Sequence, residues 1–148
     1  MANYSDDQDL TAVRPDILQY NRTSWAEYHV EAKSVIDRAI ECLWYKKAAA
    51  DRDIDWAVSG GEFDPARLDA SQLTRLSVYK VLEMAYLWLA NVDKEPDGYF
   101  RLSEYFGDKY EEELRNLLAL GLDYDWDLDD TIEAHERLTP QFRRLERM

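Results

Sequence analysis

The stretch Leu73–Val92, LTRLSVYKVLEMAYLWLANV, decides the fold that this sequence predicts. Fourteen of its twenty residues are apolar when Ala and Tyr are counted, and its only charged residues are Arg75, Lys80 and Glu83. The side of the predicted helix that is polar up to Lys80 becomes apolar after it, so Met84–Ala90 has almost no solvent-facing side. Such a helix has to be covered all round, either at the centre of a small bundle or by a neighbouring subunit.

The length and the cysteine content set the class of protein. A chain of 148 residues suits one domain with a core that needs no disulfide and no metal. The single cysteine, Cys42, excludes an intrachain disulfide and a CxxC zinc site, and we expect it to be a small buried residue. The N-terminal MANYSDDQDL lacks an apolar signal core, and the charges inside Leu73–Val92 argue against a membrane span.

The charge balance and the aromatic content point to protein partners. The chain has 18 basic and 31 acidic residues, a formal net charge of −13. Such a surface repels phosphate backbones, so we do not expect specific nucleic-acid binding. Ten Tyr and five Trp are more than a core of this size needs, and both residue types are enriched at protein–protein interfaces.

Four helices are predicted, joined by short connections that favour an antiparallel bundle. Ser5 and Gln8 have the form of a capping box for a helix to about Val13, and Ser24 and Glu27 for a helix to about Ala50. The central helix follows, and the last helix has this predicted inner side: Tyr99, Leu102, Phe106, Tyr110, Leu114, Leu117 and Leu118. We expect a kink at Gly107 within it and Gly121 at its C-terminal cap.

The segment after Gly121 changes period. It reads LDYDWDLD over residues 122–129, in which every second residue is an aspartate. This alternation predicts a short strand, with Ile54–Val58 or another subunit as its partner. We therefore divide the chain into a helical bundle, 1–121, and an acidic strand with a basic C-terminal arm, 122–148. The arm from Arg137 carries four arginines and one glutamate.

No motif in the sequence carries catalysis. Counted from Asp123, the EF-hand positions for glycine and glutamate hold Leu128 and Ala134, so only an irregular carboxylate site for calcium stays open. His29 and His135 belong to no HxxxH or HExxH pattern, and we expect structural roles for both. We expect no cofactor, and we predict that the chain is not an enzyme.

The order of these segments resembles the head–tail connector proteins of tailed bacteriophages, which are small helical adaptors beneath the portal. The matching stretches cover most of the chain: Tyr4-Ser5 with Asp9-Leu10, Arg14–Leu18, Ile54-Asp55-Trp56, Gln72–Leu76 with Tyr79-Lys80, and Gly121–Asp127.

This resemblance implies a virion protein of the neck, assembled in the host cytoplasm as a homo-oligomeric ring that is usually dodecameric. The ring would extend the DNA channel below the portal protein and dock the next neck or tail protein, a stopper or gateway protein. Double-stranded DNA would pass through without specific binding, and no membrane is involved. In similar proteins a C-terminal extension reaches the portal.

The residues that we expect at protein interfaces come from the central helix, the late strand and the arm. They are Met84, Leu87, Trp88, Tyr124, Trp126, Leu128, Arg143, Arg144 and Arg147. Two other functions stay open at this point. The alternating aspartates suit an acidic inhibitor that mimics DNA, and the abundant carboxylates suit a small metal-dependent enzyme.

Overall fold

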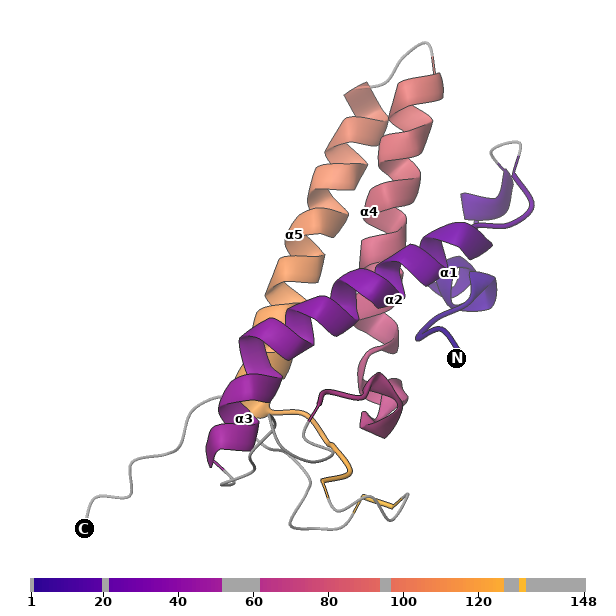
Figure 1. Ribbon diagram of the computed structural model, residues 1–148. Helices are drawn as coiled ribbons and strands as arrows, with labels where there is room; N and C mark the ends of the chain where they lie inside the picture. Colours follow the sequence, from indigo (N-terminus) through magenta and orange to yellow (C-terminus); the bar gives the residue numbers. More distant parts are fainter. Residues whose placement is uncertain (1, 20–21, 52–61, 94–96, 127–130, 133–148) are drawn as a thin grey trace. The chain divides into compact units, whose positions relative to one another are not determined.

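The computed structural model describes residues 2–19, 22–51, 62–93, 97–126 and 131–132 (Figure 1). The chain forms two compact units. Unit 1 comprises Met1–Ile36 and Ser71–Leu114, and unit 2 comprises Asp37–Ala70 and Arg115–Met148. The described residues are mainly α-helical, which confirms the predicted fold class. None of their helices is long and apolar enough to cross a membrane.

Unit 1 holds most of the helices. It contains α1 (Asp7–Val13), the 3₁₀ turn η1 (Ile17–Gln19), α4 (Thr74–Val92) and the larger parts of two helices that continue into unit 2. Those two helices are α2 (Ala26–Ile40) and α5 (Asp97–Leu120).

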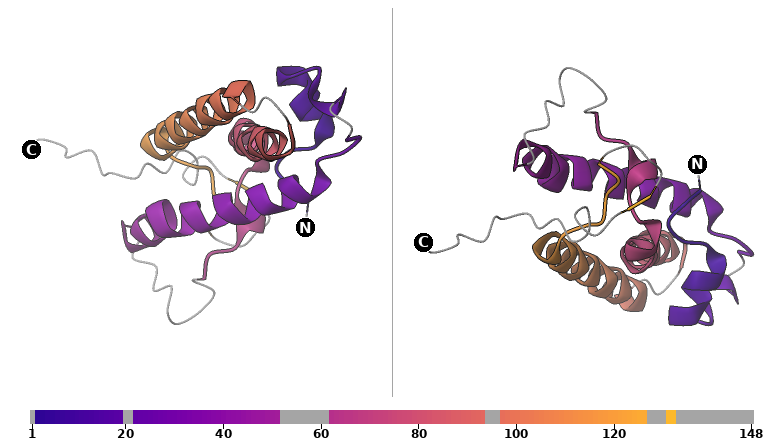
Figure 2. Two further views of the ribbon diagram at one scale, coloured as in Figure 1. Left: turned by 90° about the horizontal axis from the view of Figure 1, so that it is seen from above. Right: turned by 90° about the horizontal axis from the view of Figure 1, so that it is seen from below.

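The helix α4 is the centre of unit 1, as its composition predicts. The two views of Figure 2 show α4 between α5 and α1, with α2 on a further side. Its buried residues are Leu76, Ser77, Val78, Val81, Leu82, Ala85, Tyr86, Leu89 and Ala90. Six of them, Val78, Val81, Leu82, Ala85, Tyr86 and Leu89, pack with Leu10, Ile17 and Trp25 into one core. The stretch Met84–Ala90 is nevertheless not covered all round, because Leu87 is 45% exposed.

The start of α1 corrects one predicted cap. Asp6 is the N-cap and forms a capping box with Asp9: the Asp9 amide donates to Asp6 (3.0 Å), and the Asp6 amide donates to Asp9 (2.9 Å). Ser5 does not cap the helix, because its hydroxyl is buried against α2 and α4. Aspartate and serine are similarly good N-caps, so the sequence alone does not decide whether Ser5 or Asp6 is the N-cap.

Gly107 lies where α5 packs closely on α4, and the helix runs through it without interruption. A Cβ atom at this position would be 3.2 Å from the carboxyl group of Glu83. The adjacent Ser103 hydroxyl donates to the Glu83 carbonyl oxygen (2.9 Å). The glycine therefore allows close approach of the two helices and is no kink.

Gly107→Ala is expected to stabilise the chain more in a Glu83→Ala background than in the wild type. Alanine is the better helix former by about 0.8–1.0 kcal/mol. The new methyl group must displace the Glu83 carboxylate, which Lys80 holds at 2.9 Å, so the gain in the wild type should be smaller than in a Glu83→Ala background. Urea unfolding of the four variants measures this coupling. Equal gains in both backgrounds would contradict the close approach.

In unit 2, the last residues of α2 lead into one π-helical turn, η2 (Glu41–Tyr45), followed by α3 (Lys46–Asp51). Apolar residues recur every four positions here. In a regular α-helix, with about 3.6 residues per turn, residues at this spacing do not stay on one side of the helix, and the wider π-helical turn keeps them together. As a result Trp44 and Tyr45 are both buried, while Leu43 is 47% exposed. Cys42 is exposed as well, so its predicted burial is wrong.

Residues 62–73 connect the units through two 3₁₀ turns, η3 (Pro65–Arg67) and η4 (Ala70–Gln72). Asp64 caps η3 by accepting a hydrogen bond from the Ala66 amide, and Pro65 is the first residue of the turn. After α5, Gly121 takes the left-handed conformation (φ 98°) of a helix C-terminal cap, which confirms the cap that the sequence predicts.

The predicted late strand does not form within the described residues, which contain only an isolated antiparallel bridge between Leu68 and Tyr124. The Asp69 amide donates to the Asp123 carbonyl (3.2 Å), and the Asp125 amide donates to the Arg67 carbonyl (3.0 Å). These bonds satisfy the extended backbone from a loop of the same unit. The proposed partner segment Ile54–Val58 lies outside the described residues.

Candidate protein-interaction surface

Three of the predicted interface residues lie on the second half of α4. Leu87 is 45% exposed, while Met84 and Trp88 are half-buried. Trp88 is held in its own unit, because its ring packs edge-on against Trp25 with ring centroids 5.6 Å apart. Leu87 is thus the residue of the three that is most available to a partner.

Phe100, which the sequence did not single out, lies on the same side of the helix pair as Leu87. It is 42% exposed. Ser103 and Gly107 of α5 both face Glu83 of α4. The two helices run antiparallel, and Phe100 is one turn before Ser103 while Leu87 is one turn after Glu83. The two apolar side chains are therefore neighbours, one helical turn along the pair from the contact between Ser103 and Glu83.

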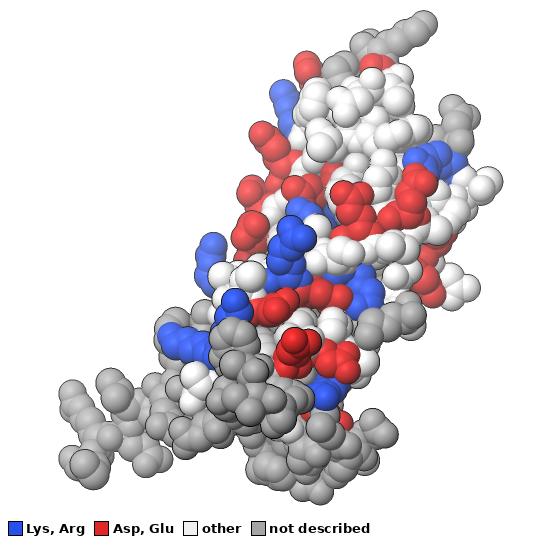
Figure 3. Space-filling view, viewed as in Figure 1, with Lys and Arg blue, Asp and Glu red and all other residues white. Residues whose placement is uncertain are grey.

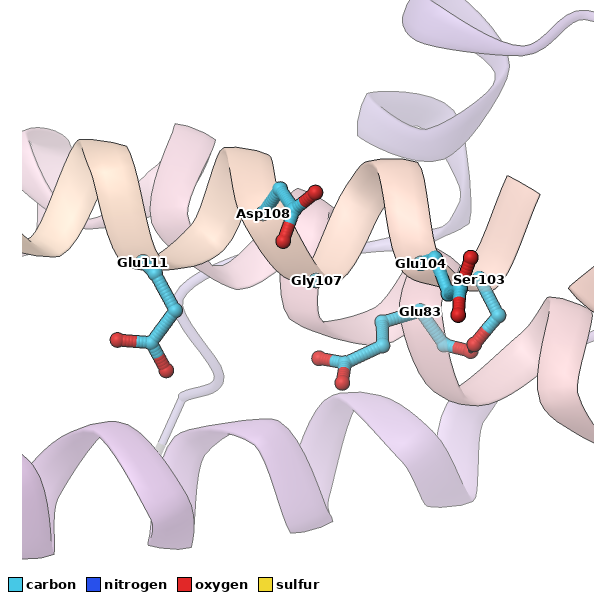
Figure 4. A pocket seen from close by; sticks show the side chains of 6 residues that line it. All are labelled: Glu83, Ser103, Glu104, Gly107, Asp108 and Glu111. Carbon is cyan, nitrogen blue, oxygen red and sulfur yellow. The ribbon is translucent and has the colours of Figure 1, made fainter. Parts of the chain in front are cut away.

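An acidic groove continues from this apolar pair along the same side of α4 and α5. It has a volume of about 500 Å³ and is lined by Glu83, Ser103, Glu104, Gly107, Asp108 and Glu111. Figure 4 shows these side chains coming from both helices. Three of the carboxylates, on Glu104, Asp108 and Glu111, are exposed, whereas Glu83 is half-buried and is paired with Lys80. We call the groove, together with Leu87 and Phe100, the α4–α5 face.

Figure 3 shows the surroundings of this face in unit 1. Uncharged side chains gather over the ends of α4 and α5 next to their connection, and acidic side chains with basic ones among them lie farther along the pair. A groove with an apolar end and an acidic remainder suits a protein segment that offers apolar and basic side chains in the same order.

In unit 2, Tyr124 and Trp126 belong to an aromatic cluster. Tyr124 is fully buried, and Trp126 is half-buried and stacks on Tyr45 with ring centroids 5.7 Å apart. Trp44 and Phe63 complete the cluster. Burial and the neighbouring Tyr124 raise the pKa of Tyr45 to about 12. These rings pack against their own unit, so the structure gives both residues a structural role besides any role at an interface.

The remaining predicted interface residues, Leu128, Arg143, Arg144 and Arg147, lie outside the described residues. The aspartates before them do not all face solvent as the alternation predicts, because Asp125 is only 5% exposed and Asp123 is half-buried. In the described part of the chain, no group of three His, Cys, Asp or Glu side chains is placed to hold a metal ion.

A buried polar network joins the N-terminal segment to α2 and α4. The Ser5 hydroxyl lies 2.8 Å from Nδ1 of His29 and 2.7 Å from the Ser77 hydroxyl, and Nε2 of His29 lies 3.1 Å from Asp7. A carboxylate only accepts, so Nε2 carries a proton, and when the ring is neutral the Ser5 hydroxyl donates to Nδ1. His29 is 2% exposed and Ser5 is 5% exposed.

The serine, histidine and carboxylate of this network do not have the arrangement of a hydrolase. In that arrangement the serine bonds Nε2 and the carboxylate bonds Nδ1, which is the reverse of the order here. The Ser5 hydroxyl is also engaged by both His29 and Ser77 inside the core. The network therefore fixes the N-terminal segment against the two helices.

Asp7→Asn is expected to remove a pH-dependent part of the stability. Burial raises the pKa of Asp7, but hydrogen bonds from Ser24, the Trp25 amide and His29 outweigh it, so the pKa lies below the ordinary 3.8. The unfolded state then binds the proton more tightly, and the stabilisation is present above pH 3.8 and lost as the pH falls through the lower folded value. We expect a cost of about 1–2 kcal/mol at neutral pH.

Thermal unfolding of both proteins across acidic pH measures this difference. It should shrink as the pH falls below 3.8, the ordinary pKa of the group. Gln8→Ala, at the exposed neighbouring position, is the control and should change little. A difference that stays constant at every pH would contradict the role of the ionised carboxylate.

Comparison with known proteins identifies no relative. No family model matches the chain, and neither the curated proteins nor the solved structures contain a match.

Proposed function

We propose that the chain is a non-enzymatic head–tail connector of a tailed-phage virion. It would form a ring beneath the portal, extend the DNA channel and dock the next neck or tail protein. The observation that supports this best is the exposed apolar pair Leu87 and Phe100 beside the acidic groove of α4 and α5. Exposed apolar side chains beside a polar rim are typical of protein-binding surfaces. The connector assignment itself rests on the resemblance of the sequence.

The acidic character of the chain fits this function. A net charge of −13 gives a surface that repels phosphate, and a channel built from such copies would not retain DNA during its passage. The exposed carboxylates of α5 add to this field in unit 1.

The acidic character alone would also suit a protein that mimics DNA. Mimicry needs an exposed array of carboxylates, and the alternating aspartates do not provide one over the described residues, because Asp125 is buried. The exposed carboxylates of α5 keep mimicry as the second candidate, and competition with DNA distinguishes the two functions.

Binding to the cognate portal protein, with DNA as competitor, tests the proposal. A connector binds the purified portal, and added double-stranded DNA leaves that binding unchanged. Leu87→Ser combined with Phe100→Ser should weaken assembly while leaving the far-UV circular dichroism unchanged, because both side chains are more than 40% exposed. Displacement by DNA, or no binding to the portal at any concentration, would contradict the proposal.

A further inference from the structure

The α4–α5 face has an unusual sequence of properties along its length. Leu87 and Phe100 form an apolar end with 45% and 42% exposure. Along α5, the row Phe100, Glu104, Gly107 and Glu111 then leads from this end into the carboxylates. Its occupant should carry an apolar anchor followed by several cations.

We propose that this face binds residues 137–148 of a second copy of the chain. The inference rests on the proposed function in one respect, namely that a ring brings a second copy alongside. It gives the C-terminal arm a partner within the ring in place of the portal.

Charge is the first argument for this occupant. Residues 137–148, RLTPQFRRLERM, carry four arginines and one glutamate, a net side-chain charge of +3 in a chain whose total is −13. The face offers the exposed carboxylates of Glu104, Asp108 and Glu111. Arginine is the cation best suited to carboxylates, because its planar group donates two parallel hydrogen bonds.

The order of side chains is the second argument. Phe142 directly precedes Arg143 and Arg144 in the arm. An aromatic anchor against Leu87 and Phe100 would place the following arginines toward the carboxylate row. Nucleic acid is a poor occupant, since the same carboxylates repel phosphate.

A labelled peptide of residues 137–148 tests the binding directly. The host is the full-length chain with Arg143→Glu and Arg144→Glu, so that its own arm does not compete. We expect saturable binding that weakens with added salt and falls at least about tenfold when Glu104→Lys and Asp108→Lys are introduced into the host. Phe142→Ala in the peptide should weaken it as well.

The control host carries Glu31→Lys and Glu41→Lys, which change two exposed acids that do not line the groove and alter the net charge equally. This host should bind the peptide nearly as well as the parent. Equal losses in the control and in the groove variant would show general electrostatic attraction and overturn the proposal. Absence of binding to the parent host would overturn it too.

A charge exchange between full-length copies tests the contact in the assembly. Copies with a reversed arm (Arg143→Glu, Arg144→Glu) and copies with a reversed groove (Glu104→Lys, Asp108→Lys) should each self-associate less than the wild type. Mixing them should restore association, because the acidic arm of one fits the basic groove of the other. If the mixture associates no better than its components while the wild type forms rings, the inference is overturned.

The two experiments separate this inference from the proposed function. Specific peptide binding with no ring under any condition supports the contact and contradicts the ring. Rings that are insensitive to both reversals support the connector and overturn the contact. Reversed arms that abolish portal binding while self-association is unchanged also overturn it, since the arm would then belong to the portal.

Discussion

Trp44→Ala is expected to destabilise unit 2 strongly, because it removes the largest fully buried side chain of the aromatic cluster. The ring of Trp44 is 0% exposed, and its centroid lies 6.0 Å from that of Tyr124 and 5.9 Å from that of Trp126. Truncating a buried tryptophan costs about 3–5 kcal/mol. Whole domains of this size have only about 5–15 kcal/mol of stability, so the loss is a large fraction of the total.

Urea unfolding followed by near-ultraviolet circular dichroism measures this effect. Leu43→Ala is the matched control, because Leu43 is the preceding residue of the same π-helical turn and is 47% exposed. It should change the free energy of unfolding by about 0.5 kcal/mol or less. Similar losses in the free energy of unfolding for the two variants would contradict the arrangement in which Trp44 is buried and Leu43 is exposed.

Trp25→Ala is expected to have an effect of similar size on unit 1. Trp25 is fully buried, stacks on Tyr28 and donates its indole N–H to the Ile17 carbonyl (3.0 Å). The Arg22 guanidinium lies over the Trp25 ring, 4.4 Å from its centroid. We expect a loss of about 3–5 kcal/mol, because the side chain joins the N-terminal segment, the start of α2 and the core around α4.

Trp25→Phe separates packing from hydrogen bonding. It keeps an aromatic ring and removes the donor to the buried Ile17 carbonyl, so we expect a loss of about 1–3 kcal/mol. Val30→Ala, at an exposed position of the following helix α2 (57% exposed), is the control. In thermal unfolding, Trp25→Ala should lose the most stability, Trp25→Phe should lose less, and Val30→Ala should lose the least. A Phe variant as stable as the wild type would rule out the hydrogen bond as a significant contribution.

The helices could be predicted because their signals are local. The apolar stretch Leu73–Val92 became α4 with its first residue as N-cap, and the predicted inner side of α5 is buried or half-buried throughout. Gly121 acts at the predicted cap, because cap geometry depends on a few neighbouring residues.

The failures of prediction come from contacts distant in the sequence. The exposure of Cys42 follows from a π-helical turn, in which Trp44 packs against Tyr124 and Trp126, residues far away in the sequence. The alternation after Gly121 suggested a strand, yet a loop around Leu68 satisfies the extended backbone instead.

The candidate face was only half predictable. Leu87 was identified from the excess of apolar residues on its helix, but its pairing with Phe100 depends on the register of α4 against α5. The spacing of Phe100, Glu104, Gly107 and Glu111 was visible in the sequence as one helical row. What it could not show was that this row lies beside Glu83 of the other helix.

The most direct test of the proposed connector is electron microscopy of the purified full-length chain, alone at rising concentration and together with its cognate portal. The account predicts closed rings with an axial opening, which form on the portal if they do not form alone. Single copies under both conditions, with no ring and no portal complex, would contradict it.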